Sequence, residues 1–165
     1  MKRYLQSGMV LAFAGVLGIA AGSVNPAQDI TKTRKKFDLR GSILRKFLQE
    51  NHCPDEPYAD MFIAEADTHG LDWRLLPSIS VIESGGGRTA KGNNLFGWAN
   101  GKSTFQSFGE AIHEVASSLS VARPYKGKDL LGKLSAFNSE RADYAAAVLQ
   151  VMRRISPQPQ VGTAR

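Results

Sequence analysis

The sequence holds a single cysteine, Cys53, among its 165 residues. One cysteine cannot form an internal disulfide, and it excludes a metal site built from several thiolates. The three histidines, His52, His69 and His113, are far apart along the chain and do not show the spacing of metal ligands. We therefore predict no metal site and no cofactor, and we interpret Cys53 as a buried, neutral thiol.

The chain also lacks a hydrophobic run of the length that a bilayer-spanning helix needs. The uncharged apolar stretch from Gly8 to Gly22 is shorter than the roughly 20 residues of such a helix. Because Lys2 and Arg3 precede it and small residues follow it, residues 1–22 are predicted to be a secretory signal peptide. The alternative is an uncleaved membrane anchor. Both interpretations predict an exported protein of the periplasm or cell envelope.

Acidic residues are fewer than basic ones, since 15 Asp and Glu stand against 21 Lys and Arg, for a formal net charge of +6. This bias suits an anionic partner such as a cell-wall polymer, although many proteins without such a partner carry as much charge. No nucleic-acid-binding module is visible, so nucleic acid is not an expected partner. Residues 23–41, with the basic cluster Arg34, Lys35 and Lys36, are predicted to be a polar linker.

The sequence shows no internal repeat, no strand-rich pattern and no alternation of strands with helices. These absences favour a mainly α fold, in one domain over residues 42–156 followed by a tail over 157–165. Apolar residues at helical spacing predict helices over about residues 42–50, 55–69, 72–83, 107–121, 130–136 and 141–155.

Residue types at the ends of these segments predict where the helices start and stop. Asp55 and Asp72 are expected to be the N-caps of the second and third helices. Gly70 is expected to end the second helix, and the glycines from Gly85 to Gly87 to end the third.

One acid occupies an unusual place at the end of the third predicted helix, "LLPSISVIESGGG". Glu83 lies four and seven residues after Ile79 and Leu76, so it shares the apolar stripe of the helix. Burial and the negative end of the helix dipole both disfavour a charged carboxylate there. An acid that keeps its proton near neutral pH can protonate a glycosidic oxygen.

The three glycines after this acid have two interpretations. Backbone without side chains leaves room for a bulky substrate beside Glu83, which predicts a cleft. Alternatively, Gly85 to Gly87 form only a helix cap and a loop, and Glu83 pairs with Arg88. Spacing alone leaves both interpretations open.

Three segments of the chain carry a resemblance to a known family. "GLDWRLLPSISVIESGGG" resembles the catalytic helix of lysozyme-like lytic transglycosylases and glucosaminidases, in which a hydrophobic stretch leads into Glu-Ser-Gly. "NNLFGW" followed by "FQSFGEAIHEVASSL" is similar to the glucosaminidase family, the mannosyl-glycoprotein endo-β-N-acetylglucosaminidase-like domains. "RADYAAAVLQVMRRI" is similar to the closing helix of that family. The segments stand in the family's order and cover about residues 58–155.

The resemblance implies a lysozyme-like α fold with a much reduced β-lobe, and cleavage of peptidoglycan glycan strands with Glu83 as general acid. It also implies a set of residues that bind the sugar: Ser84, Asn94, Phe96, Gly97, Trp98 and Tyr144. Aromatic rings such as Phe96 and Trp98 suit stacking on sugars, although packing in the core is their other role.

The sequence departs from the family where many members carry a second acid. The interval "WANGKST" holds no Asp or Glu, and the later acids Glu110, Glu114, Asp129 and Asp143 are expected on solvated helix faces. The carboxylate pair of most glycosidases is therefore not visible, and a single-acid mechanism with help from the substrate's N-acetyl group is predicted. Attack by water gives a hydrolase, and attack by the sugar's own 6-hydroxyl gives a lytic transglycosylase. An inactive peptidoglycan-binding module is the remaining alternative.

Overall fold

The computed structural model of the chain describes residues 38–157. The predicted signal peptide, and nearly all of the predicted linker and tail, lie outside the described residues. The helices of the described part are α2 (Arg40–Glu50), the short 3-10 helix η1 (Glu56–Tyr58), α3 (Ala59–His69), α4 (Leu75–Ser84), α5 (Phe108–Val121), α6 (Leu130–Phe137) and α7 (Tyr144–Ile155). Residues 38–157 contain no β-strand, so the predicted mainly α fold is confirmed. Within this range, none of the helices is both long and apolar enough to span a membrane.

The glycine stops and one predicted start have the geometry that the sequence indicates. Gly70 and Gly85 follow α3 and α4 in the left-handed conformation, each with φ of 63°, which glycine adopts at little cost. Ser107 caps α5, because its side chain accepts a hydrogen bond from the backbone N–H of Glu110 at 3.1 Å. Pro77 lies in the first turn of α4, where a missing N–H breaks no helical hydrogen bond.

Asp55 stands at the predicted N-cap position, before η1, but its side chain makes no cap hydrogen bond, and the predicted cap at Asp72 is wrong because the N-cap of α4 is Arg74. Asp55 is fully buried and accepts a hydrogen bond of 2.5 Å from the hydroxyl of Ser80 in α4 instead of capping the helix beside it. Asp72 pairs with Arg74 at 2.6 Å, and α4 begins three residues after it, at Leu75. Asp72 also accepts from the backbone N–H of Arg74 at 3.0 Å, so both the backbone and the guanidinium of Arg74 bind its carboxylate.

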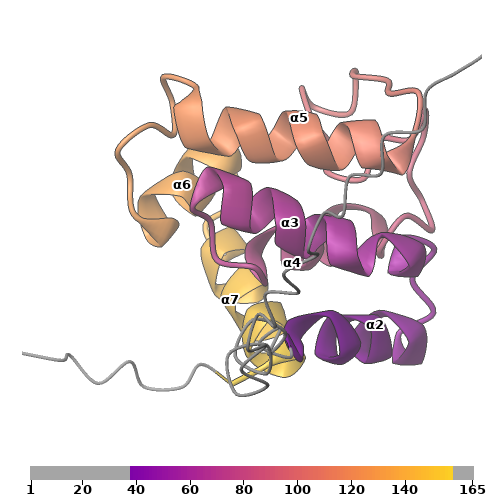
Figure 1. Cartoon of the computed structure of the whole chain (residues 1–165). Helices are drawn as coiled ribbons and strands as arrows, with labels where there is room; N and C mark the ends of the chain where they lie inside the picture. Colours follow the sequence, from indigo (N-terminus) through magenta and orange to yellow (C-terminus); the bar gives the residue numbers. More distant parts are fainter. Residues whose placement is uncertain (1–37, 158–165) are drawn as a thin grey trace, which may run out of the picture. The chain divides into compact units, whose positions relative to one another are not determined.

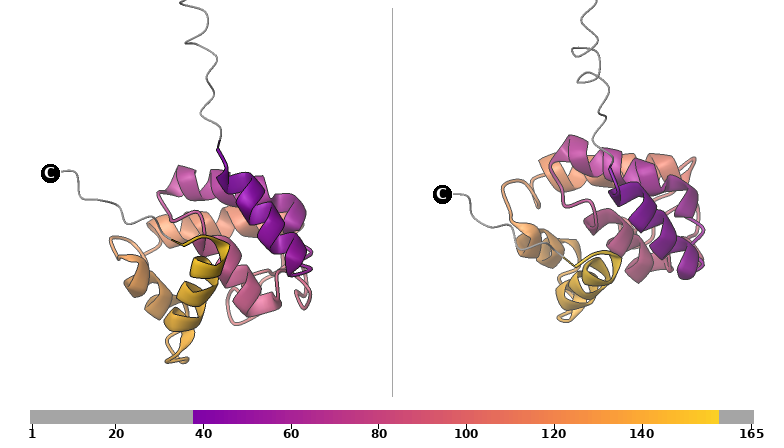
Figure 2. Two further views of the ribbon diagram at one scale, coloured as in Figure 1. Left: turned by 90° about the horizontal axis from the view of Figure 1, so that it is seen from below. Right: turned by 60° about the horizontal axis from the view of Figure 1, so that its bottom comes forward.

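The helices pack around α3 and α4. Figure 1 shows α3 between α5 and α2, and these are two of the closest helix pairings in the described chain. The third is α4 with α7, which Figure 2 shows side by side from two further directions. Each helix from α2 to α7 contributes fully or almost fully buried side chains to one core, among them Leu44, Phe62, Leu76, Ile112, Leu134 and Val148. Burial of this apolar surface is the main stabilising contribution, and it holds the end of α4 against the start of α7.

Candidate functional site

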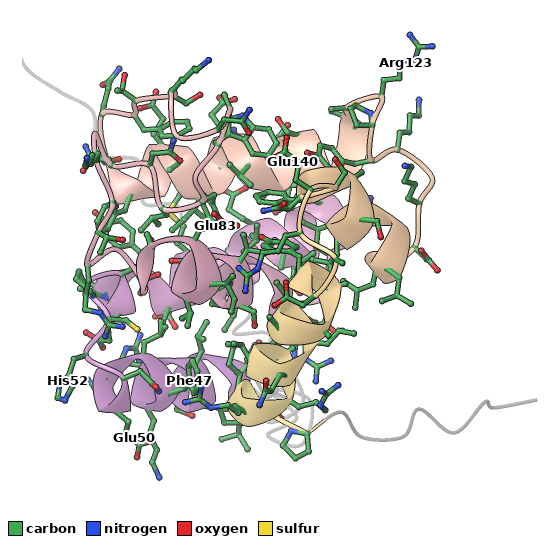
Figure 3. All side chains as sticks on the ribbon, turned by 180° about the vertical axis from the view of Figure 1, so that it is seen from behind. Phe47, Glu50, His52, Glu83, Arg123 and Glu140 are labelled. Atoms are coloured by element: carbon green, nitrogen blue, oxygen red, sulfur yellow. The ribbon has the colours of Figure 1, made fainter. Side chains whose placement is uncertain are left out.

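Glu83 lies in the last turn of α4 and is half-buried. Leu76 and Ile79, on the same face of α4, are fully buried, whereas Glu83 at the end of that face is partly exposed. Figure 3 shows Glu83 at the end of α4, in the middle of the molecule as seen from behind. Oε2 of Glu83 lies against the backbone of Gly97, where an added Cβ would be 2.8 Å from it. The end of α4 therefore presents its carboxyl to the segment that follows the three glycines.

The alternative pairing of Glu83 with Arg88 is not formed. Nη1 of Arg88 donates instead to the backbone oxygen of Asn51 at 2.6 Å, which ties the glycine turn to the end of α2. Among residues 38–157, no Lys, Arg or His lies within ion-pair distance of Glu83. The carboxyl is thus not held by a structural ion pair in the described chain.

The hydroxyl of Tyr144 lies beside the Glu83 carboxyl. Tyr144 is the first residue of α7 and is almost fully buried, and its hydroxyl has no hydrogen bond of ordinary geometry. Burial raises the pKa of Tyr144 well above its ordinary value, and the nearby Glu83 carboxylate raises it further. The hydroxyl therefore keeps its proton at any pH at which the protein would work. Buried hydroxyls are normally bonded, so this one is available as a donor.

Arg141 brings a positive charge to the same place. Its guanidinium lies 5.9 Å from the centre of the Tyr144 ring, and its Nε is 3.0 Å from Oδ1 of Asp143. The Asp143 carboxylate raises the pKa of Arg141, and the more distant Glu83 carboxylate adds to this effect. Arg141 was not among the residues that the sequence predicts for the site.

Asn94 holds the turn that carries Gly97 past Glu83. Its side-chain amide donates to the backbone oxygens of Trp98 and Ser103, each at 3.0 Å, and its oxygen accepts from the N–H of Trp98 at 2.8 Å. Gly97 has φ of 59° in this turn, a conformation that favours glycine. Asn94 is buried, so it fixes the loop and does not face solvent.

Ser84 and Phe96 are likewise buried. The hydroxyl of Ser84 donates to the backbone oxygen of Leu95 at 2.8 Å and accepts from the N–H of Gly87 at 3.0 Å. The ring of Phe96 is fully enclosed in the core. In this conformation neither side chain reaches a ligand at the surface, and both fasten the loop to α4. Of the residues implied by the resemblance, Gly97, Trp98 and Tyr144 lie around Glu83 and the cavity beside it.

An aromatic cavity of about 360 Å³ opens next to Gly97. Its lining consists of Gly97, Trp98, Ala99, Asn100, Tyr125 and Phe137. The Trp98 ring lies 5.7 Å from the Phe137 ring and 6.2 Å from the Tyr125 ring, measured between centroids. Phe137 in turn stacks on Tyr144, with centroids 5.8 Å apart and planes at 5°. A continuous row of rings thus connects the cavity to Tyr144, the tyrosine beside Glu83. The volume of the cavity is in the range that small ligands occupy.

A second hollow, of about 220 Å³, is lined by residues of α6, of α7 and of the segment between them. Arg141 and Tyr144 contribute to its lining. No Asp or Glu lines either of these two cavities of the described chain.

The later acids have structural positions. Asp129 caps α6 by accepting from the N–H of Gly132 at 2.8 Å. Glu110 is half-buried and accepts from the N–H of Gln106, the residue before the N-cap Ser107, so its predicted solvated position is wrong. Glu114 and Asp143 are exposed, as predicted. Glu83, in contrast, lies against Gly97, a residue of the cavity lining.

Cys53 is buried as predicted, and burial raises its pKa to about 11, so the thiol is neutral. Burial raises the pKa of Asp55 to about 6.

His69 and His113, which are far apart in sequence, lie together with Glu65 because α3 packs along α5. The expectation that the histidines are scattered is therefore wrong for these two.

Tyr125 and Phe137 are cavity residues that the sequence did not identify. Each belongs to an ordinary apolar pattern or turn, and only the fold brings them to Trp98.

No protein-family model matches the chain, and no curated protein or solved structure is significantly similar to it.

Proposed function

We propose that the protein is an exported peptidoglycan-cleaving glycosidase of the endo-β-N-acetylglucosaminidase type, a member of the glucosaminidase family with a lysozyme-like α fold. Glu83 is its general acid. The observation that carries this proposal is the Glu83 carboxyl against Gly97 and beside the Tyr144 hydroxyl, next to an aromatic cavity. The resemblance of three sequence segments to the family supplies the substrate class.

Glu83 acts by giving a proton to the glycosidic oxygen as the bond breaks. The neutral hydroxyl of Tyr144 then donates a hydrogen bond to the carboxylate that remains, and the positive charge of Arg141 further stabilises it. Gly97, which has no side chain, allows the Glu83 carboxyl to lie against the backbone at the edge of the cavity. Trp98 and Phe137 bind the sugar ring through their aromatic faces.

Glu83 is not itself part of either cavity lining but lies against the lining residue Gly97, and no other Asp or Glu lines the two cavities of the described chain, so the proposed mechanism uses a single acid. In this mechanism the substrate's own N-acetyl group stabilises the positive charge that develops at the sugar. Glu83 afterwards acts as base and takes a proton from the group that attacks. If water attacks, the product is a new reducing end, and if the sugar's 6-hydroxyl attacks, the product is an anhydro sugar.

The absence of a second acid from the cavity linings also favours one second candidate, a peptidoglycan-binding module without catalytic activity. Such a module would use the aromatic cavity for the sugar and would not need a second carboxylate. Peptidoglycan strands are the partner in both cases, no role for nucleic acid is proposed, and contact with a membrane would come only through the N-terminal segment.

The experiment that tests the proposal incubates the purified protein with isolated peptidoglycan and identifies the soluble products by mass spectrometry. Fragments with reducing GlcNAc ends are expected from the proposed glucosaminidase. Reducing MurNAc ends would move the cleavage to the other bond, and anhydro-MurNAc ends would make the protein a lytic transglycosylase. Sedimentation with the wall without any soluble fragment would contradict catalysis and leave the binding module.

A further inference from the structure

A cluster of three potential ligands lies between α3 and α5. Glu65 and His69 are one helical turn apart on α3, so their side chains share a face. Because α3 packs against α5, His113 of α5 lies beside Glu65 and His69. One ligand atom from each residue lies within 4.8 Å of the other two.

The distances fit the geometry of zinc. Nδ1 of His113 is 3.1 Å from Oε2 of Glu65, and Nε2 of His69 is 3.4 Å from the same oxygen. With zinc bonds of about 2.0–2.1 Å and tetrahedral angles, neighbouring ligand atoms are about 3.3 Å apart. Two of the three separations therefore match a tetrahedral site already. The third, between the two imidazole nitrogens, closes by rotation of His113, whose side chain is 57% exposed.

His69 provides an independent observation. Its Nε2 is buried and has no hydrogen-bond partner, although the Glu65 oxygen is only 3.4 Å away. Buried polar atoms of proteins are nearly always bonded, so the position of this nitrogen calls for an explanation. A cation between the nitrogen and the carboxylate would satisfy both groups.

An ordinary ion pair is the competing explanation of the cluster. It accounts for His113, whose Nδ1 lies 3.2 Å and 3.1 Å from the two oxygens of Glu65. For His69 the ion pair is incomplete, because Nε2 lies within ion-pair distance of Oε2 of Glu65, at 3.4 Å, but without hydrogen-bond geometry. The two rings are tilted by 59° with centroids 6.2 Å apart, an arrangement in which both can turn a nitrogen toward one point beside Glu65.

We propose that Glu65, His69 and His113 form a Zn²⁺ site that links α3 to α5, with water as the fourth ligand. Two imidazoles and one carboxylate are a ligand set that zinc uses in proteins when one position stays open. Copper and nickel are expected to bind the same nitrogens, because imidazole is a suitable ligand for these metals as well as for zinc. The site is independent of the proposed role of Glu83, since it uses other side chains on other helices.

The test is calorimetric titration of the purified full-length chain with ZnCl₂, after treatment with a chelator and dialysis. His113→Ala and Glu65→Gln remove one ligand each, and both residues are partly or largely exposed. His52→Asn is the matched control, because His52 lies at the far end of α2 in Figure 3 and its positive φ of 51° is one that asparagine tolerates. Circular dichroism of each variant shows that it is folded.

The wild type and His52→Asn are expected to bind one Zn²⁺ per chain with equal affinity. His113→Ala and Glu65→Gln are expected to bind at least tenfold more weakly. Zinc is also expected to raise the thermal midpoint of the wild type and not that of His113→Ala, because binding only to the folded state stabilises it. Unchanged binding by both ligand variants, loss of binding in His52→Asn, or no saturable binding by the wild type would each overturn the proposal.

Discussion

Gly97 lies so close to Glu83 that a Cβ at position 97 would be 2.8 Å from Oε2 of the carboxyl. Gly97 also has φ of 59°, where L-residues with a side chain are strained. The conformation therefore favours glycine, and the contact means that a side chain at position 97 would displace the Glu83 carboxyl. Together they fix the distance between the end of α4 and the loop that Asn94 holds.

Gly97→Ala is expected to lower activity by at least tenfold and to destabilise the protein by about 1–3 kcal/mol. The added methyl group displaces the carboxyl, and the positive φ adds strain. Gly70→Ala is the matched control, because Gly70 has φ of 63° and nothing within 4 Å of an added Cβ. Urea unfolding should show similar destabilisation of both variants, while release of peptidoglycan fragments should fall only in Gly97→Ala. An equal loss of activity in Gly70→Ala would show that strain alone is responsible.

Tyr144→Phe is expected to keep its fold and to lose activity. The hydroxyl that it removes is buried beside Glu83 but has no hydrogen bond of ordinary geometry, so its loss should change the free energy of unfolding by no more than about 1 kcal/mol. Fragment release should fall by about tenfold or more, because the carboxylate of Glu83 loses a nearby donor. Tyr58→Phe, outside the site, serves as control. Full activity of Tyr144→Phe would remove the hydroxyl from the mechanism.

Trp98 is expected to report sugar binding directly. The chain has two tryptophans, so Trp73→Phe leaves Trp98 as the only indole, and its fluorescence should change when GlcNAc oligomers are added. Trp98→Leu should weaken binding of the oligomers by about tenfold, which corresponds to about 1.4 kcal/mol. Trp73→Leu, which alters a half-buried tryptophan outside the cavity lining, should bind normally. Equal affinities of the two leucine variants would exclude the aromatic cavity as the sugar site.

Asp55 is expected to make the stability of the protein depend on pH in a defined window. Burial raises its pKa from 3.8 to about 6, so between these values the folded state holds a proton that the unfolded state has released. The contribution of Asp55 to the free energy of unfolding therefore falls as pH rises through the window. Relative to the wild type, Asp55→Asn should gain on the order of 2 kcal/mol between about pH 4 and about pH 7. Urea unfolding at both pH values measures this, and a constant difference would contradict the buried charge.

The helices could be predicted because their signals are local. Apolar spacing of three and four residues and the glycines at positions 70 and 85 depend only on neighbours in the sequence, and the structure confirms them. The roles of Asp55 and Asp72 could not be predicted in this way. Asp55 is bound by Ser80, 25 residues away, which only the fold brings to it, whereas Asp72 is bound by its near neighbour Arg74, and the capping pattern does not distinguish such a pair from a cap.

The candidate site was predictable in part for the same reason. Glu83 and Gly97 stand in recognisable segments, and Trp98 occupies a loop in which an aromatic residue is conspicuous. Tyr125 and Phe137 reach the cavity only because the helices after α5 fold back toward this loop. Helical spacing on α3 already places Glu65 and His69 together, but the third member of that cluster comes from α5 and needs the packing of the two helices.

The most direct test of the account is the rate at which Glu83→Gln releases soluble fragments from peptidoglycan. The substitution keeps the size of the side chain and removes the proton that general acid catalysis requires, so the rate should fall by about 10²–10⁴-fold. Glu114→Gln, an exposed acid on α5, should retain wild-type activity, and so should Glu140→Gln on the connection before α7. Wild-type rates in Glu83→Gln, or a comparable loss in Glu140→Gln, would contradict the claim that Glu83 is the single catalytic acid.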